Sequence, residues 1–161
     1  MKNIMVFIHG LESSALGTKG QYFRQHFPQM IIEDFTGDFK ARMNKLSDIL
    51  RGKENLVIVG SSYGGTMAVQ YALANEKKIR KLILLAPALH LNELSMPSNK
   101  VFHIPVIIYH GLQDNVVEPY LVEKIARKHF VNLQHHFVED DHSLHDTFPL
   151  LDWRALLKAD S

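Results

Sequence analysis

Three residues that lie far apart in the sequence carry the side chains that acyl chemistry needs: Ser62, Asp114 and His142. A serine hydroxyl is a poor nucleophile near neutral pH unless an imidazole takes its proton. The imidazole in turn needs a carboxylate that fixes its tautomer and stabilises its positive charge. We therefore predict that Ser62 attacks an acyl carbonyl, that His142 is its base, and that Asp114 orients His142.

The stretch around Ser62 has the pattern of a nucleophile elbow. Gly60, Ser62 and Gly64 match G-x-S-x-G, in which a buried strand turns sharply into a helix and exposes the serine at the turn. Larger side chains at the flanking positions would collide as strand and helix close on each other. A helix that starts at Tyr63 would direct free NH groups and its positive dipole end towards Ser62. The alternative is an ordinary tight turn, because so short a motif also occurs by chance.

The predicted carboxylate and base each follow an apolar run. Asp114 lies in the loop after residues 104–109, and His142 lies just beyond residues 133–138. Asp114 could instead be a turn-forming aspartate that binds its own backbone. His145 is a rival base in the same loop, and we favour His142 because it is closer to the end of its predicted strand.

A further loop offers donors for the negative charge that develops on the carbonyl oxygen. His9, Gly10 and Leu11 directly follow the first apolar run. Gly10 lets the backbone bend, and we predict that the NH groups of Leu11 and Tyr63 form the oxyanion hole. For His9, a structural role or a place in the pocket wall is favoured over proton transfer.

We expect four residues to contact the substrate, namely His9, Phe35, Met96 and Leu112. Apolar residues of this kind are also common in protein cores. No metal or other cofactor is predicted. Two adjacent histidines in the last predicted strand point to opposite faces, so they cannot bind one metal ion together. A second group of possible metal ligands lacks a third firmly placed member. It consists of His142, His145, Asp141 and Asp146.

Apolar runs separated by helical patterns must position these residues. Continuous apolar runs are typical of strands that are buried on both faces of a parallel sheet, and four occur, at residues 4–8, 56–59, 82–86 and 104–109. Weaker strands are predicted at residues 30–33 and 133–138. Helices are predicted at about residues 19–26, 39–50, 63–76, 119–130 and 144–157. This alternation predicts an open, mostly parallel six-stranded α/β sheet with helices on both faces and ligands at the carboxyl ends of the strands.

Composition narrows the class of protein. The 161 residues suit one domain, and 46% hydrophobic with 22% charged residues is ordinary for a soluble globular protein. A formal charge of +1 gives no electrostatic reason for nucleic-acid binding. Cysteine is absent, which excludes disulfides and thiolate chemistry. No apolar run reaches the length of a membrane span, and a cytoplasmic protein with a small acyl substrate as its partner is expected. The oligomeric state is not fixed by the sequence.

In its motifs and their order, the sequence resembles the α/β-hydrolase superfamily, in particular its small, lidless bacterial serine esterases. The resemblance covers nearly the whole chain. It rests on four stretches: His9-Gly10 after the first strand, the elbow at Ser62, the run from Gly111 through Asp114 to Pro119, and Asp141-His142. It implies an α/β-hydrolase fold and hydrolysis of a small ester or thioester through an acyl-serine, without a cofactor. The same triad also suits an acyltransferase or an amidase, and a binding module on this fold is the rival from another class.

The sequence also departs from the family pattern. The chain begins at what is usually the third strand, so the sheet should have six strands rather than eight. Residues 87–103, where a lid is usually inserted, form only a short run, which predicts an exposed, shallow site that favours small acyl groups. Asp140 and Asp141 precede His142, where many members have glycine.

Overall fold

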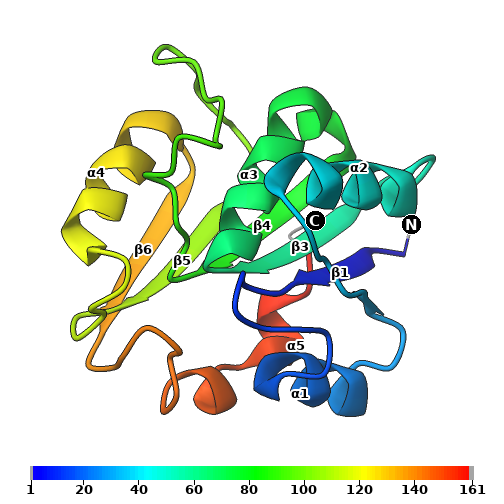
Figure 1. Ribbon diagram of the computed structural model, residues 1–161, viewed down its shortest axis with the longest axis horizontal. Coiled ribbons are helices and arrows are strands. Elements are labelled where there is room, and N and C mark those ends of the chain that lie inside the picture. The colour runs from blue at the N-terminus through cyan, green and yellow to red at the C-terminus, as the bar shows by residue number, and fades with distance from the viewer. Residues whose placement is uncertain (1, 160–161) are drawn as a thin grey trace.

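The computed structural model describes residues 2–159. Within this range, six parallel strands form one sheet in the order β2-β1-β3-β4-β5-β6 (Figure 1). The strands are β1 (Ile4–Ile8), β2 (Ile31–Ile32), β3 (Leu56–Ser61), β4 (Ile79–Leu85), β5 (Val106–Gly111) and β6 (Leu133–Val138). The helices are α1 (Thr18–His26), α2 (Phe39–Leu50), α3 (Tyr63–Asn75), α4 (Pro119–His129) and α5 (Trp153–Leu156). The predicted fold class is confirmed, and every strand was placed within three residues of its observed ends.

Helices cover both faces of the sheet, as Figure 1 shows. On one face, Leu56 and Ile58 of β3 belong to a core shared with α2, α3 and α4. On the other face, Val57 and Val59 belong to a core that includes Phe23 of α1 and residues of α5. All four β3 side chains are fully buried. Alternate residues of a strand point to opposite faces, so the continuous apolar run of β3 reflects burial on both sides.

The strand order places the site. The chain passes from β1 to β2 on one side and then crosses to β3 on the other side of β1. In open α/β sheets, loops diverge at such a switch point and leave a crevice at the carboxyl ends of the strands. The loop after β1 and the turn at Ser62 after β3 therefore lie beside each other.

Residues 87–103 form no α-helix and no strand apart from a single bridge at Phe102. Ala88, Leu89 and Leu94 from this segment are buried in the core with α3. The segment thus packs onto the domain and does not form a lid, as expected. Across residues 2–159, no helix has both the length and the apolar character needed to cross a bilayer.

The predicted helix over residues 144–157 is wrong. The chain adopts a positive φ of 51° at Leu144, forms a 3-10 turn at Phe148–Leu150, and has one helical turn at α5. Pro149 has no NH group and is disfavoured inside a helix. Most of the apolar residues looked helical in spacing because they pack into one core, although the chain turns between them and leaves Leu150 exposed.

Asp140 explains why this segment turns. Its buried carboxylate accepts hydrogen bonds from the NH groups of Asp141 (2.8 Å), Asp146 (3.1 Å) and Thr147 (2.7 Å). Burial alone would raise the pKa of Asp140, but the hydrogen bonds from Thr147 and the other NH groups outweigh it and lower this pKa. Asp140, two residues before His142, therefore shapes the loop that carries His142.

We expect His135 on β6 to make the fold less stable in acid. Both of its ring nitrogens are buried and without a hydrogen-bond partner among the described residues. Burial lowers its pKa to about 4, against the partly opposing charge of Glu123. The unfolded chain binds this proton at about pH 6.5. The contribution of neutral His135 to the free energy of unfolding should therefore be fully present above about pH 6.5 and should be lost as the pH falls towards 4.

We expect His135→Leu to relieve this penalty. The variant should gain about 1–2 kcal/mol over the wild type at pH 5, beyond any difference at pH 7.5. Urea unfolding followed by circular dichroism at the two pH values measures both differences. Equal differences at pH 5 and pH 7.5 would show that His135 does not carry the acid sensitivity.

Candidate active site

Ser62 stands at a strained turn between β3 and α3. Its backbone has φ 54° and ψ −113°. A residue other than glycine adopts such angles only where the surrounding structure holds it in place. Its NH donates to the Leu85 carbonyl (2.9 Å), and its carbonyl accepts from Gly65 (2.9 Å) and Ala88 (3.1 Å). These bonds to β4 and to the segment after it fix the turn, so the hydroxyl position is set by the sheet.

The flanking glycines are needed for close approach. A Cβ atom on Gly60 would lie 2.6 Å from the Gly64 carbonyl oxygen, and a Cβ atom on Gly64 would lie 2.1 Å from the Ile8 carbonyl oxygen. Both distances are shorter than any real contact of this type. Glycine therefore allows α3 to start directly against the ends of β1 and β3, as predicted for the elbow.

The structure brings Ser62, His142 and Asp114 into one hydrogen-bonded row. Nε2 of His142 lies 3.0 Å from the Ser62 hydroxyl oxygen, and Nδ1 lies 2.7 Å from Oδ2 of Asp114. A carboxylate only accepts, so Nδ1 carries the proton and Nε2 is free to accept the serine proton. The Asp114 side chain is fully buried, whereas 21% of the His142 side chain is exposed.

The Asp114 carboxylate is saturated with donors. Oδ1 accepts from the NH groups of Val116 (2.9 Å) and Val117 (2.8 Å), and Oδ2 accepts from His142 and from His110 (3.0 Å). Burial would raise the pKa of Asp114, but the Val117 NH, His142 and the Val116 NH outweigh it and lower the pKa. The side chain is therefore ionised at neutral pH, as an orienting carboxylate must be.

His145 does not share this geometry. Its side chain is exposed, and among the described residues its ring has no hydrogen bond. Only its backbone NH is engaged, with the Asp141 carboxylate at 3.3 Å. Of the two histidines in this loop, His142 is the one in contact with Ser62.

The two predicted oxyanion donors border the same cavity as Ser62. Leu11 and Tyr63 both line it. Within residues 2–159, neither backbone NH donates to another group of the chain. Both donors are therefore available to an oxygen atom bound next to the serine hydroxyl.

His9 has a structural contact on the far side of this loop. Its Nε2 accepts from the NH of Phe35 (2.9 Å), and its Nδ1 donates to the Gly10 carbonyl (2.7 Å). These two bonds fix a neutral ring and the start of the loop that presents Leu11. His9 also lines the cavity, so the expectation of a structural role and a place in the wall agrees with its position.

The cavity beside Ser62 has a volume of about 880 Å³. It is larger than the shallow site expected from the missing lid, because α1 and the turn before α5 rise beside the elbow and wall it. Most of the wall is apolar and includes Phe7, Tyr22, Leu91, Val117 and Phe148. This volume is in the range of pockets that enclose small organic ligands.

Three residues expected to contact substrate lie elsewhere. Phe35 is only 2% exposed and packs in the core beneath His9. Met96 packs against the same core, and Leu112 donates its NH to the Val138 carbonyl at 2.8 Å. None of the three lines the cavity. Their apolar character could not distinguish a core position from a pocket wall.

Lys19, a cation in the cavity wall, was not predicted from the sequence. Its Nζ donates to the Ser143 carbonyl (2.6 Å), next to His142, and lies 5.5 Å from the centre of the Phe148 ring. Burial lowers its pKa, against the charges of Asp141 and Asp140. Lys19 thus ties α1 to the loop that carries His142, and only its place after the oxyanion loop could have pointed to it.

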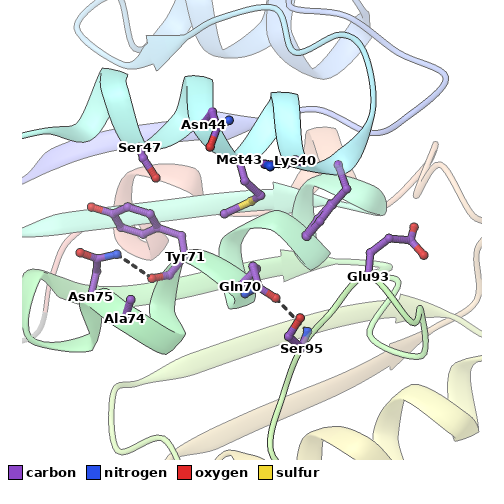
Figure 2. A pocket seen from close by; sticks show the side chains of 11 residues that line it. Lys40, Met43, Asn44, Ser47, Gln70, Tyr71, Ala74, Asn75, Glu93 and Ser95 are labelled. Atoms are coloured by element: carbon purple, nitrogen blue, oxygen red, sulfur yellow. Dashed lines mark hydrogen bonds between the residues drawn. The ribbon is translucent and has the colours of Figure 1, made fainter.

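A second cavity of about 350 Å³ lies between α2 and α3 (Figure 2). Two of its amide side chains are engaged with backbone: Gln70 accepts from the Ser95 NH (2.9 Å), and Asn75 donates to the Tyr71 carbonyl (3.0 Å). The described residues that line it include no histidine and no serine next to a base. Within residues 2–159, no group of three or more His, Cys, Asp or Glu residues is arranged to hold a metal ion. The Ser62 cavity, by contrast, is bordered by a serine hydroxyl in contact with an imidazole.

Comparison with known proteins agrees with this geometry. A protein-family model described as serine aminopeptidase, S33, matches residues 9–103, which is more than half of the chain. The chain belongs to this family. It is an α/β hydrolase of the S33 type by sequence and by fold, and the match includes Gly10, Leu11 and the elbow at Ser62.

Individual relatives of this S33-family chain are distant. It is 27% identical over 115 residues to a protein of Mycoplasma genitalium named as a proposed esterase/lipase 2, with 62% of this chain and 42% of the relative covered. It is 28% identical over 102 residues to homoserine O-succinyltransferase of Ectopseudomonas mendocina, covering 62% and 26%. The chain thus spans less than half of either relative.

Two solved structures share the fold of the S33-family chain. Est1E of Butyrivibrio proteoclasticus, with ferulic acid bound, aligns with a TM-score of 0.75 at 14% identity, covering 96% of this chain and 86% of that one. An esterase of Thermogutta terrifontis aligns with a TM-score of 0.71 at 13% identity, covering 98% and 91%. At these identities the likeness concerns the fold alone.

Proposed function

We propose that this protein is a serine hydrolase that cleaves a carboxylic ester or thioester through an acyl-serine intermediate. The observation that carries the proposal is the row of Ser62, His142 and Asp114, with contacts of 3.0 Å and 2.7 Å, at the edge of an 880 Å³ cavity. The esterase/lipase name of the Mycoplasma genitalium relative supports the same class of reaction.

Each group has one role in the proposed reaction. Oγ of Ser62 attacks the acyl carbon while Nε2 of His142 takes its proton, and Asp114 remains ionised against Nδ1. The NH groups of Leu11 and Tyr63 stabilise the negative charge on the carbonyl oxygen. His142 then gives its proton to the leaving alcohol or thiol. Water, deprotonated by His142, releases the acid and restores Ser62.

The cavity supports acyl groups larger than acetyl. Its apolar wall and volume of about 880 Å³ offer burial to a medium-length or aromatic acyl group. Burial of each additional methylene contributes about 0.8 kcal/mol. We therefore propose that the preferred substrate fills this cavity, in place of the small acyl groups that the sequence alone favoured.

Acyl transfer to an alcohol is the second candidate. The chain is 32% identical over 72 residues to homoserine O-acetyltransferase of Thermus thermophilus, besides its likeness to the succinyltransferase. Transfer uses the same acyl-serine and differs only in the acceptor that resolves it. The triad geometry is common to both reactions, so the products must decide.

Trapping the intermediate tests the proposal. We expect wild-type protein mixed with p-nitrophenyl hexanoate or hexanoyl thioester, and quenched early, to gain the mass of one acyl group on the peptide that contains Ser62. Intact and peptide mass spectrometry measure the adduct. Homoserine added as acceptor should leave free acid as the product for a hydrolase and yield an O-acyl product for a transferase. Turnover with the acyl group on another residue would contradict the role of Ser62.

A further inference from the structure

His110 is a second imidazole on the proposed orienting carboxylate. It occupies the end of β5, and its side chain is fully buried. Its Nε2 lies 3.0 Å from Oδ2 of Asp114 and 3.0 Å from the carbonyl oxygen of Val117. Oδ2 is the same oxygen that accepts from Nδ1 of His142 at 2.7 Å. One carboxylate oxygen therefore holds two imidazole rings, and the triad assigns a role to only one of them.

The contacts of His110 determine its tautomer and charge. A carboxylate and a carbonyl can only accept, so Nε2 must carry the proton that both share. Its Nδ1 is buried and without a partner among the described residues. A protonated ring would bury a second N–H with no acceptor, which is costly. Burial accordingly lowers the pKa of His110, although the Val117 carbonyl and the Asp114 charge oppose this effect. His110 is thus a neutral, fixed donor.

The surroundings leave this donor without a substitute. The backbone NH groups of Val116 and Val117 both bind Oδ1, so they hold only one end of the carboxylate. Among the described residues, the titratable groups that face His110 are Asp114, His142 and, from the neighbouring strand β6, His135, whose ring nitrogens have no hydrogen-bond partner there. Within the described residues, His110 is the one donor besides His142 that reaches Oδ2.

We infer that His110 is a positioning residue that holds Oδ2 of Asp114 towards His142 and disperses part of its negative charge. The inference rests on the proposed function, because it assigns His110 to the same acyl chemistry. Without the Nε2–H bond, the carboxylate can turn about its Cβ–Cγ bond, and the His142 ring loses its fixed direction towards Ser62. A carboxylate that stays in place keeps its full charge on Oδ2, which stabilises the protonated form of His142, so that at low pH a larger share of His142 cannot take the serine proton.

Three substitutions separate the donor from the packing of the ring. His110→Gln places an amide N–H close to the position of Nε2. His110→Leu removes the donor but fills the space, and His110→Asn keeps an amide that is one methylene too short. We expect kcat/KM to fall about tenfold to a hundredfold in the Leu and Asn variants. In these two variants KM should change little and the acid limb of the pH profile should move to higher pH. The Gln variant should stay within about threefold of wild type, with an unmoved acid limb.

A readout without substrate keeps this test independent of the reaction. The far-downfield NMR signal of the His142 Nδ1 proton, assigned by its loss in His142→Ala, should persist in His110→Gln and shift or broaden in His110→Leu and His110→Asn. If the wild type hydrolyses no ester, the proposed function fails while this signal still reports on His110. Equal losses in all three variants would show a packing role and overturn the inference, as would wild-type behaviour of the Asn variant. His110→Asn decides should His110→Leu not fold.

Discussion

Replacement of Ser62 by alanine should lower kcat for ester hydrolysis by about a millionfold. The hydroxyl oxygen that the substitution removes lies 3.0 Å from Nε2 of His142 and borders the cavity. Without it, acyl transfer to the protein cannot occur, and only slow direct attack by water remains, assisted by the oxyanion donors. KM should change little, since the cavity walls stay in place.

Two measurements check this result. Steady-state hydrolysis of a p-nitrophenyl ester gives kcat, and a fluorophosphonate probe should label the wild type once per chain and leave the Ser62→Ala variant unlabelled. Ser47→Ala is the matched control, because Ser47 is an exposed serine that borders the other cavity between α2 and α3. The control should keep full activity and labelling. A Ser62→Ala protein that is folded and hydrolyses esters at the wild-type rate would exclude the proposed mechanism.

Local patterns were sufficient to predict the parts of the molecule that local chemistry determines. The strand β3 and the elbow at Ser62 could be predicted because burial on both faces demands a continuous apolar run, and close packing at Gly60 and Gly64 admits no side chain. The row with Asp114 and His142 could be predicted because carboxyl ends of parallel strands meet at one edge. The roles of these residues remain predictions until activity is measured.

Features that depend on contacts between separate parts of the chain could not be predicted from the sequence. The turn that replaces the last predicted helix depends on where the buried carboxylate of Asp140 finds its NH donors, some of which come from residues six and seven positions later. The cavity wall depends on α1 lying beside the loop after His142, a contact that the bond from Lys19 to Ser143 spans across 124 positions. An apolar residue such as Phe35 has the same pattern in a core as in a pocket.

The contact between His110 and Asp114 could not be predicted from the sequence either. His110 stands directly before Gly111 in a motif that pointed to Asp114, yet no spacing rule shows that its ring turns back to Oδ2. Gly111 is needed there because a Cβ atom would lie 2.3 Å from the Asp140 carbonyl oxygen. The loops after β5 and β6 are thereby packed against each other, which sets the distance between Asp114 and His142.

The two histidines of the last loop provide the second large contrast. We expect His142→Ala to lower kcat by about a millionfold, as loss of the base does in other serine hydrolases with a triad. The matched variant His145→Ala should retain kcat within about tenfold. The difference arises because Nε2 of His142 contacts the Ser62 hydroxyl at 3.0 Å, whereas the exposed ring of His145 only borders the cavity.

Both variants should be assayed with the same ester and with the fluorophosphonate probe, because labelling of Ser62 also requires the base to take its proton. The His142→Ala protein should label far more slowly than the His145→Ala protein, and circular dichroism should show both to be folded. A reversed order, with activity lost on removal of His145 and kept without His142, would mean that the loop rearranges to present His145 during catalysis. The hydrogen bond from Nδ1 of His142 to the buried Asp114 opposes such a rearrangement. Releasing it would leave Oδ2 with His110 as its one remaining donor among the described residues.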